Sequence, residues 1–366
     1  MSRPTKATIN LSAIGHNYTL AKQLQPNSKA VAIIKADAYG HGAKAVASYL
    51  ESQATLNVDA FGVACIEEAV ELREGGIKKP ILLLEGFFSA DELDYISENN
   101  LWTAVHCRQQ IEQIAQSQPK QPIHVWLKLD SGMHRLGFEP SAYQAAFEQL
   151  AALPQVASVN CMSHFAHADD LDAPQNSQQL ATFLEATAGL PQGTQFSIAN
   201  SAATLGHMAA RQHWQRPGIM LYGATPFNHT HNNGDQLQVA MSLTSAVIAL
   251  HTLEAGESVG YSGTWTAKRN STIATVAIGY ADGYPRHLPS GAPVLVNGQI
   301  APLAGRVSMD MITVDVTGLS GVSMGSPVEL WGSNIHANQI AQQADTIAYT
   351  LFTGLGKRVP RQYISL

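Results

Sequence analysis

Residues 30–42 read AVAIIKADAYGHG, a short apolar run followed directly by a lysine. Residues 30–34 carry no polar side chain, as expected for a strand that is buried on both faces of a parallel sheet. Lys35 comes next, so either its side chain extends outward to solvent or its amine is needed inside the protein. The stretch therefore raises two questions: which sheet contains this strand, and what Lys35 does.

The first 225 residues alternate short β-rich runs with longer helical patterns. Helical patterns such as IEEAVELREGG (66–76) end in glycine, as helix C-termini commonly do. Eight strands separated by helices are what a (β/α)8 barrel requires. A doubly wound open sheet is the alternative, which is weakened because no glycine-rich dinucleotide fingerprint follows the first strand. The expected strands are 29–36, 59–65, 80–86, 101–106, 123–130, 158–165, 195–200 and 219–223.

The character of the chain changes near residue 228. NHTHNNGDQ (228–236) is a polar, glycine-containing segment that we interpret as a linker rather than a metal site. The following sequence is β-rich, with a two-residue hairpin signal at VNGQ (296–299) and a short helix expected within 338–354. We therefore predict an α/β protein with a (β/α)8 barrel over residues 1–231 and a mainly β domain over residues 232–366.

Composition excludes several classes of protein. The chain has 366 residues and a net charge of −6, which gives no basic field for nucleic acid. It has no apolar run long enough to cross a membrane, and its start, MSRPTKATINLSAIGHN, lacks the apolar region of a signal peptide. Three widely spaced cysteines favour neither disulfides nor structural zinc. We expect a cytoplasmic enzyme without a metal site or membrane association.

Polar groups follow five of the eight expected strands. Because the C-terminal ends of barrel strands meet on one face, we expect these groups to lie together at an active site. Each alone is commonly a solvated or structural residue. A lysine buried near apolar groups, however, has a lowered pKa and becomes a nucleophile for carbonyls. The groups are Lys35, Lys128 with the DSGMHR that follows it, His164, Asn200-Ser201 and Tyr222.

The stretch IIKADAYGHG (33–42) resembles the lysine motif that binds pyridoxal phosphate in alanine racemases. Further motifs of this family follow in order along nearly the whole chain, a pattern far more specific than any single one. The resemblance implies an N-terminal (β/α)8 barrel followed by a β-domain. The motifs are KLDSGMHRLGF (128–138), SHFAHAD (163–169), ANSAA (199–203), RPGIMLYG (216–223), VGYSGTW (259–265), IGYADGYPR (278–286), GRVSMDM (305–311) and RVPR (358–361).

The resemblance implies a racemase that interconverts L-alanine and D-alanine with pyridoxal 5′-phosphate as cofactor. Lys35 would hold the cofactor covalently and act as the base on the D face of the substrate. Tyr261 would be the base on the L face, with His164 near it. Two acid/base groups on opposite faces are what racemisation needs.

Other residues would hold the cofactor. By resemblance Arg216 binds the pyridine nitrogen; a guanidinium only donates, so the ring nitrogen must stay unprotonated. The resulting weaker electron sink disfavours transamination. The phosphate ligands implied by the family are Tyr39, Ser201, Gly218 and Ile219. Tyr222 offers a further phenol, although a packing role is equally expected.

The substrate groups are also implied by resemblance. Arg135 would bind the carboxylate, as would the backbone N–H of Met309, with Asp310 beside it in the entry region. Lys128 matches a lysine that is carbamylated in several relatives and orients the arginine. Tyr280 would narrow the pocket for alanine.

The family is homodimeric, with Tyr261, Tyr280 and Met309 reaching the other subunit's site, so we expect a homodimer. One departure concerns the tyrosine that stands before RVPR in relatives; Tyr349 is too early to align with it. A wider pocket and a racemase of broader specificity, acting on serine or larger amino acids, are therefore the alternative. In a bacterium the product would supply peptidoglycan with D-alanine.

Three rival functions are disfavoured. An amino-acid decarboxylase on the same barrel would need a longer chain and another acid in place of Tyr261. A single-barrel pyridoxal-phosphate carrier would lack residues 232–366. A metal-dependent barrel hydrolase using His164 and His167 would need a carboxylate cluster that the sequence does not offer.

Overall fold

Eight parallel strands close into a barrel in the computed structural model, which describes residues 3–365. Each strand pairs in parallel with the next, and the last pairs with the first, Lys29 opposite Trp214. This closure confirms the barrel and removes the open-sheet alternative. The strands, in ring order, are β2 (Lys29–Ile33), β3 (Ala60–Val63), β4 (Ile81–Leu83), β5 (Leu101–Val105), β6 (Ile123–Lys128), β7 (Val156–Met162), β8 (Phe196–Ser197) and β9 (Trp214–Gln215).

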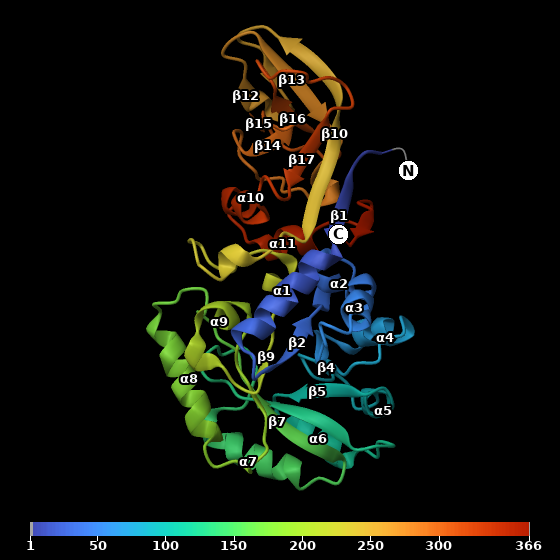
Figure 1. The fold of residues 1–366 in the computed structure, drawn as a ribbon, viewed down its shortest axis with the longest axis vertical. Coiled ribbons are helices and arrows are strands. Elements are labelled where there is room, and N and C mark those ends of the chain that lie inside the picture. Colours follow the sequence, from blue (N-terminus) through green and yellow to red (C-terminus); the bar gives the residue numbers. More distant parts are fainter. Residues whose placement is uncertain (1–2, 366) are drawn as a thin grey trace.

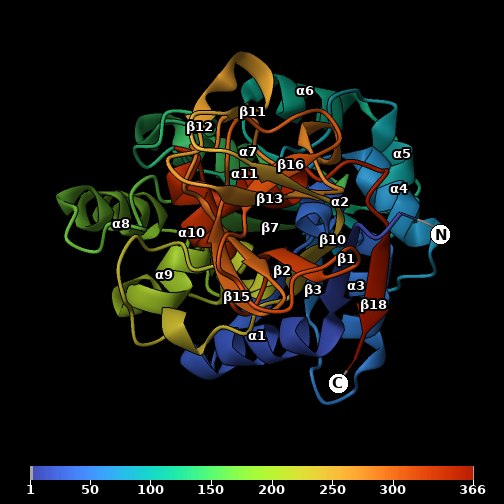
Figure 2. The ribbon, with the colours of Figure 1, turned by 90° about the horizontal axis from the view of Figure 1, so that it is seen from above.

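Helices surround the barrel, as the view along the long axis shows (Figure 2). Their apolar faces cover strands that are buried on both sides, which is why these strands carry few polar residues. The outer helices are α1 (Leu11–Leu24), α3 (Ala43–Ser52), α4 (Ile66–Glu74), α5 (Glu92–Glu98), α6 (Arg108–Gln116), α7 (Pro140–Ala151), α8 (Pro174–Thr187) and α9 (Ser201–Gly206), followed by the short 3-10 helix η1 (Met208–Ala210).

The predicted position of the eighth strand was wrong. Residues 219–223 are not a strand, because β9 lies earlier and Ile219–Tyr222 form the 3-10 helix η2. Pro217 lacks the backbone N–H that a further ladder hydrogen bond would need, so the strand cannot continue through it. The apolar run is buried because η2 packs against α1 at the barrel mouth. Apolar periodicity alone does not distinguish such a turn from a strand.

The second region, which we call the β-region, is built on an eight-stranded sheet at the other end of the molecule (Figure 1). The first strand of the chain belongs to it, antiparallel to β10 and parallel to β18. Residues 6–10 therefore precede the barrel in sequence but lie in the other sheet, while the boundary at 231/232 stays a prediction. The strands are β1 (Lys6–Asn10), β10 (Met241–Leu253), β13 (Ser271–Val276), β14 (Pro293–Val296), β15 (Gln299–Pro302), β16 (Ile312–Asp315), β17 (Pro327–Trp331) and β18 (Arg361–Ile364).

Two local predictions in this region can be compared with the structure. The VNGQ hairpin is confirmed, since Val296 pairs with Gln299 and both Asn297 and Gly298 have positive φ. The expected single helix is instead two, because Asp345 has a left-handed conformation that interrupts it. The remaining elements are α10 (Ala337–Gln343), α11 (Ala348–Thr353), β11 (Ser258–Val259), β12 (Trp265–Thr266), η3 (Gly234–Gln236), η4 (Tyr261–Gly263) and η5 (Tyr280–Asp282).

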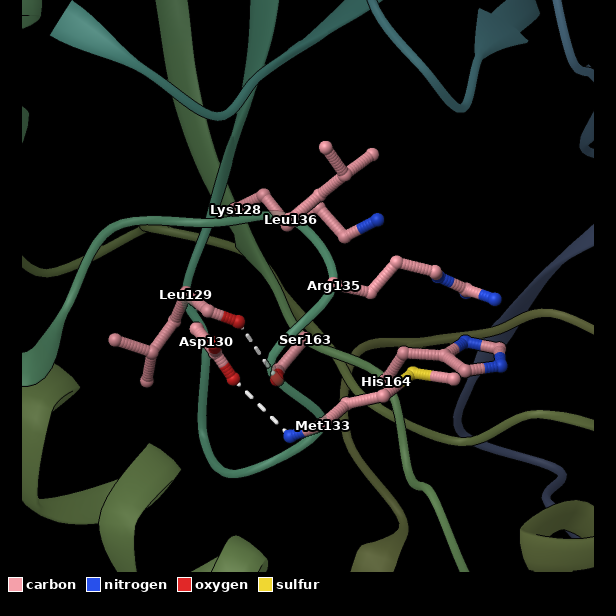
Figure 3. A pocket seen from close by; sticks show the side chains of 8 residues that line it. All are labelled: Lys128, Leu129, Asp130, Met133, Arg135, Leu136, Ser163 and His164. Carbon is pink, nitrogen blue, oxygen red and sulfur yellow. Dashed lines mark hydrogen bonds between the residues drawn. The ribbon is translucent and has the colours of Figure 1, made fainter.

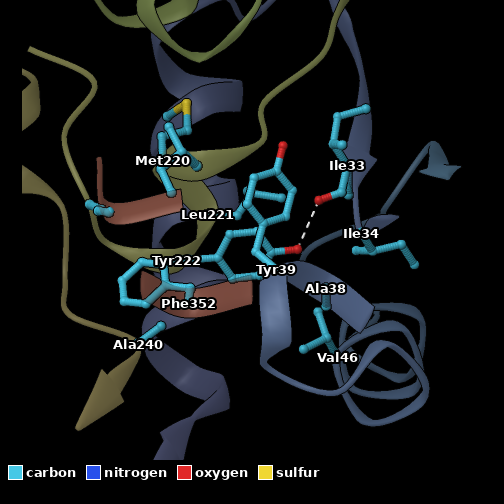
Figure 4. Close-up of a cluster of buried hydrophobic side chains, with 14 of the residues drawn as sticks. Ile33, Ile34, Ala38, Tyr39, Val46, Met220, Leu221, Tyr222, Ala240 and Phe352 are labelled. Atoms are coloured by element: carbon cyan, nitrogen blue, oxygen red, sulfur yellow. Dashed lines mark hydrogen bonds between the residues drawn. The ribbon is translucent and has the colours of Figure 1, made fainter. Parts of the chain in front are cut away.

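The two regions meet at the barrel mouth. The turn α2 (Lys35–Gly40) follows β2 and packs against α11, as Figure 1 shows at the junction. Gly40 has φ +74°, and a Cβ there would overlap the carbonyl oxygen of Phe352. Figure 4 shows the buried aromatic and aliphatic side chains that fill this contact. Within residues 3–365, no helix has both the length and the apolar character that a bilayer span requires.

A buried carboxylate ties the two ends of the chain to the β-region. Asp282 is fully buried and accepts two bonds from Arg3, at 2.6 and 2.7 Å, and one from the Gly279 N–H at 2.9 Å. Arg358 lies 2.9 Å from the same carboxylate and 2.7 Å from Asp310. Burial opposes ionisation of Asp282, but these donors outweigh it and lower its pKa.

We expect Asp282→Asn to lower the free energy of unfolding by about 2 kcal/mol at neutral pH, because it weakens hydrogen bonds to a charged group. The folded pKa of Asp282 lies below the ordinary value of 3.8, so its stabilisation is complete above that pH and is lost as pH falls through the folded pKa. The measurement is chemical denaturation of both proteins between pH 7 and pH 3.

Asp172→Asn is the matched control, since Asp172 is exposed and should change stability little. A difference between wild type and Asp282→Asn that stays constant as the pH falls would contradict an ionised Asp282 as its source.

Candidate active site

A cavity of about 760 Å³ opens at the C-terminal mouth of the barrel. It lies between the strand ends and the segment around α11, which contributes Ile347, Tyr349 and Thr353. The predicted catalytic, cofactor and substrate residues of the barrel line this cavity, although they come from distant parts of the sequence, whereas Tyr222 is not part of the lining. The predicted residues in the lining are Lys35, Tyr39, Lys128, Arg135, His164, Ser201, Arg216, Gly218 and Ile219.

Lys35 begins the turn α2 directly after β2, and its side chain lines the cavity. Burial, followed by the positive charge of Arg135, lowers the pKa of its amine. The carboxylates of Glu85 and Glu68 oppose this shift. The lysine that the sequence singled out is therefore a partly desolvated amine held among charges, not a solvated surface group.

Arg216 is buried and its donors are directed at fixed acceptors. Its guanidinium donates to Ser197 Oγ and to the Ser163 carbonyl, both at 2.5 Å. It also lies 3.3 Å from His164 Nδ1. Burial lowers the pKa of Arg216 to about 10, so the group remains cationic at neutral pH.

His164 is held as a neutral imidazole by its surroundings. Burial, and then the positive charges of Arg216 and Lys128, lower its pKa well below the ordinary value. Because Arg216 can only donate, His164 Nδ1 must accept and the proton lies on Nε2. The ring is thus a hydrogen-bond donor at its other nitrogen, and it is not a cationic acid at neutral pH.

Tyr39, Ser201, Gly218 and Ile219 meet at one wall of the cavity. Ser201 Oγ accepts from the Gly218 N–H at 2.8 Å, which joins the start of α9 to the segment before η2. A Cβ at Gly218 would lie 2.8 Å from the Tyr39 hydroxyl, so glycine leaves room for that phenol. Tyr222 has a different role, since its hydroxyl donates to the Ile33 carbonyl at 2.8 Å (Figure 4).

Lys128 and Arg135 approach the cavity from β6 and the loop that follows it. Figure 3 shows both side chains, with His164, directed to the same side of this loop. Asp130 Oδ1 accepts from the backbone N–H groups of Gly132, Met133 and His134, which fixes the loop that carries Arg135. Burial, then the charges of Arg216, Arg135 and Lys35, lower the pKa of Lys128 to about 8.

The predicted residues of the β-region do not line this cavity. Tyr261 in η4 is 67% exposed, Met309 52% and Tyr280 in η5 37%. Asp310 binds Arg358. These side chains therefore lie on the surface of the β-region, and one chain alone does not bring them to Lys35.

Three residues at or beside the site were missed by sequence reasoning. Tyr349 lines the cavity, with its ring centroid 5.8 Å from that of Tyr39, although the motif did not align it. Glu85 lines the cavity from the turn that follows β4, and Glu68 lies in the first turn of α4. Glu85 and Glu68 could have been found from the sequence as acidic residues that follow expected strands. The position of Tyr349 could not, because it depends on how α11 packs against the barrel. Among residues 3–365, no group of three His, Cys, Asp or Glu side chains is arranged to hold a metal ion.

Both parts of the chain match the models of known domains. Residues 9–226 match the model described as "Alanine racemase, N-terminal domain", and residues 240–363 match "Alanine racemase, C-terminal domain". An alanine racemase from Pseudomonas syringae pv. syringae is 52% identical over 361 residues, covering 99% of each chain. The chain therefore belongs to the alanine racemase family.

Solved structures extend the likeness to three dimensions. A biosynthetic alanine racemase from Pseudomonas aeruginosa superposes with a TM-score of 0.94 at 47% identity, over 99% of each chain. An alanine racemase from Bartonella henselae, solved with covalently bound pyridoxal phosphate, gives 0.89 at 31% identity over 99% of each chain. The chain is an isomerase of this kind, which interconverts L- and D-alanine with pyridoxal 5′-phosphate as cofactor.

Proposed function

We propose that Lys35 and Tyr261 exchange the α-proton of alanine from opposite faces, Lys35 on the D face and the tyrosine of a second subunit on the L face. The observation that carries this proposal is the partly desolvated amine of Lys35 in a cavity whose lining does not include Tyr261 of the same chain. A racemase needs two such groups, because each must be able to give or take a proton on its own side.

The residues around the cavity fit the cofactor. Lys35 supplies the amine for its covalent attachment, and the hydroxyls of Tyr39 and Ser201, which both lie next to Gly218, are donors that suit an anionic group. Tyr39, Ser201, Gly218 and Ile219 would hold its phosphate with hydroxyl and backbone donors. When bound, pyridoxal phosphate supplies the electron-withdrawing ring that makes the α-proton of the amino acid acidic.

Arg216 would set the chemistry at the ring nitrogen. Its guanidinium is fixed by Ser197, Ser163 and His164 and remains a donor at neutral pH. It can therefore hold an acceptor in place but does not supply a proton to it. Because the ring nitrogen stays unprotonated, the cofactor ring would withdraw electrons less strongly. A weaker electron sink suits a racemase, which returns every proton that it removes. His164, neutral and with a donor at Nε2, would hydrogen-bond the phenolate of Tyr261.

The exposure of Tyr261, Tyr280 and Met309 supports a homodimer in which each active site is shared. In this arrangement Tyr261 acts on the partner's substrate. The Met309 N–H and Arg135 would both bind the substrate carboxylate, with Asp310 at the entrance. No nucleic acid or membrane partner is part of the proposal.

Tyr349 bears on the choice of substrate. Its ring stands beside that of Tyr39 in the cavity, so a tyrosine occupies the region that the motif comparison left open. With Tyr280 of the partner it narrows the space for the side chain, which favours alanine over the broader-specificity alternative. The rate with L-serine relative to L-alanine decides between them. We place the enzyme in the cytoplasm, where it would supply D-alanine for peptidoglycan.

Lys128 is proposed to be carbamylated. Its amine is buried among the cations Arg216, Arg135 and Lys35, and a carbamate anion there would bind and orient Arg135. Carbamylation needs a neutral amine, and the pKa of about 8 makes this form accessible near neutral pH. With 13C-labelled bicarbonate we expect an NMR carbamate signal that is lost in Lys128→Arg and retained in the exposed-site control Lys268→Arg. A spectrum without this signal in wild type would rule the modification out.

Shared active sites predict that two inactive variants complement each other. In a heterodimer of Lys35→Ala and Tyr261→Phe, one site contains both changes and the other contains neither. Heterodimers purified with two different tags should therefore have about half of wild-type activity. Each parent homodimer should lose at least about a hundredfold in kcat.

A heterodimer of Lys35→Ala and Arg135→Ala is the matched control. Both changes lie in the barrel, so each of its sites carries one of them, and activity should not return. An inactive Lys35→Ala and Tyr261→Phe heterodimer would show that Tyr261 does not serve the partner's site.

A further inference from the structure

The residues after Lys35 adopt a backbone conformation that is rarely seen away from glycine. Ala36, Asp37, Ala38 and Tyr39 have φ between 51° and 54° and positive ψ, a turn of left-handed helix. Such a conformation costs roughly 1–2 kcal/mol for each residue with a Cβ. The surrounding structure must therefore hold the turn in place.

The far end of the turn is held by its own neighbours. Asp37 Oδ1 accepts from the Ala43 N–H at 2.7 Å. His41 Nδ1 donates to the Tyr39 carbonyl at 2.9 Å, and the His41 ring is buried against Tyr222 and Phe352. These contacts fix the part of the turn that carries Tyr39.

The near end, next to Lys35, is held by Glu68. Its Oε1 accepts from the Ala36 N–H at 2.7 Å, and its Oε2 accepts from the Ala64 N–H, also at 2.7 Å. One carboxylate therefore joins the residue after Lys35 to the end of β3. Glu68 lies in the first turn of α4, which is a rigid support on the outside of the barrel.

The negative charge of Glu68 also acts on the Lys35 amine. Burial and the charge of Arg135 lower the pKa of Lys35, and the carboxylates of Glu85 and Glu68 oppose them. Lys128 is a further cation within reach of the same amine. Glu68 thus both binds the backbone of the turn and contributes a negative charge toward Lys35.

We propose that Glu68 is a positioning residue for Lys35: by binding the Ala36 and Ala64 N–H groups it fixes the start of the left-handed turn, and so the direction in which the lysine side chain enters the cavity. This inference rests on the proposed role of Lys35. It adds a residue outside the substrate and cofactor contacts on which proton transfer depends.

Replacement by glutamine separates this role from simple packing. In Glu68→Gln the side chain keeps its length, but its NH2 group faces one of the two N–H donors and the negative charge is lost. We expect kcat to fall about tenfold or more, because small displacements of a reacting group are costly. KM for alanine should change less than about twofold, since Glu68 does not contact the substrate.

The decisive readout uses the apoenzyme. The rate of acetylation of Lys35 is measured by peptide mass spectrometry as a function of pH. Loss of the Glu68 charge should move the midpoint of this profile to lower pH in Glu68→Gln. Glu71→Gln, an exposed change on the same helix, is the control and should leave the midpoint, kcat and melting temperature unchanged.

A second variant covers the case in which Glu68→Gln folds poorly. Ala36→Gly combined with Glu68→Ala lowers the cost of the left-handed turn while leaving it without its carboxylate. The melting temperature of this double variant should return toward that of wild type, whereas its kcat should stay low. The inference is overturned if kcat and the acetylation midpoint of Glu68→Gln match those of Glu71→Gln. It is also overturned if the double variant regains full kcat along with stability. If Lys35 is acetylated equally fast in wild-type apoenzyme and holoenzyme, the assignment of Lys35 itself is what fails.

Discussion

Four cationic side chains face one cavity, and the organisation of the site depends on this charge. Lys35, Lys128, Arg135 and Arg216 lie around the mouth of the barrel, with Glu85 and Asp169 as carboxylates in the same lining. Burial and mutual repulsion lower the pKa of both lysines. Such a cavity favours anionic groups, namely a phosphate and a carboxylate, and makes the loss of a proton from its lysines easier than in water.

The barrel contributes the residues that line the cavity, whereas the β-region contributes residues that are exposed on its surface. Short parallel strands hold the four cations at the ends of three β/α units, with Lys128 and Arg135 in the same unit, so their positions follow from the closure of the barrel. The β-region instead presents Tyr261 and Tyr280 on short 3-10 turns at its surface. Arg358 binds both Asp282 in η5 and Asp310 next to Met309, and so links these two segments. One chain thus carries two halves of a site that do not meet within it.

The barrel and the strand-end residues Lys35, Lys128 and His164 could be predicted from local patterns, whereas the other site residues were implied by resemblance to the family. Apolar strands followed by polar residues predict where side chains gather, and Lys35, Lys128 and His164 lie where strand ends place them. The failures have physical causes. Ile219–Tyr222 are as apolar as a strand but form a buried 3-10 turn. The left-handed turn after Lys35 could not be predicted, since its residues Ala-Asp-Ala-Tyr have no intrinsic preference for positive φ and tertiary contacts impose it. Tyr349 reaches the site only through the packing of α11.

The most direct test of the account is to locate the lysine that carries the cofactor. The cavity contains two candidates, Lys35 and Lys128, both with lowered pKa. Purified enzyme is treated with borohydride, which makes the link to the cofactor permanent, and the labelled peptide is then sequenced. The account predicts loss of the yellow colour and label on Lys35 alone. Label on Lys128 or on any other lysine would contradict the assignment of Lys35 and, with it, the roles derived for the residues around it.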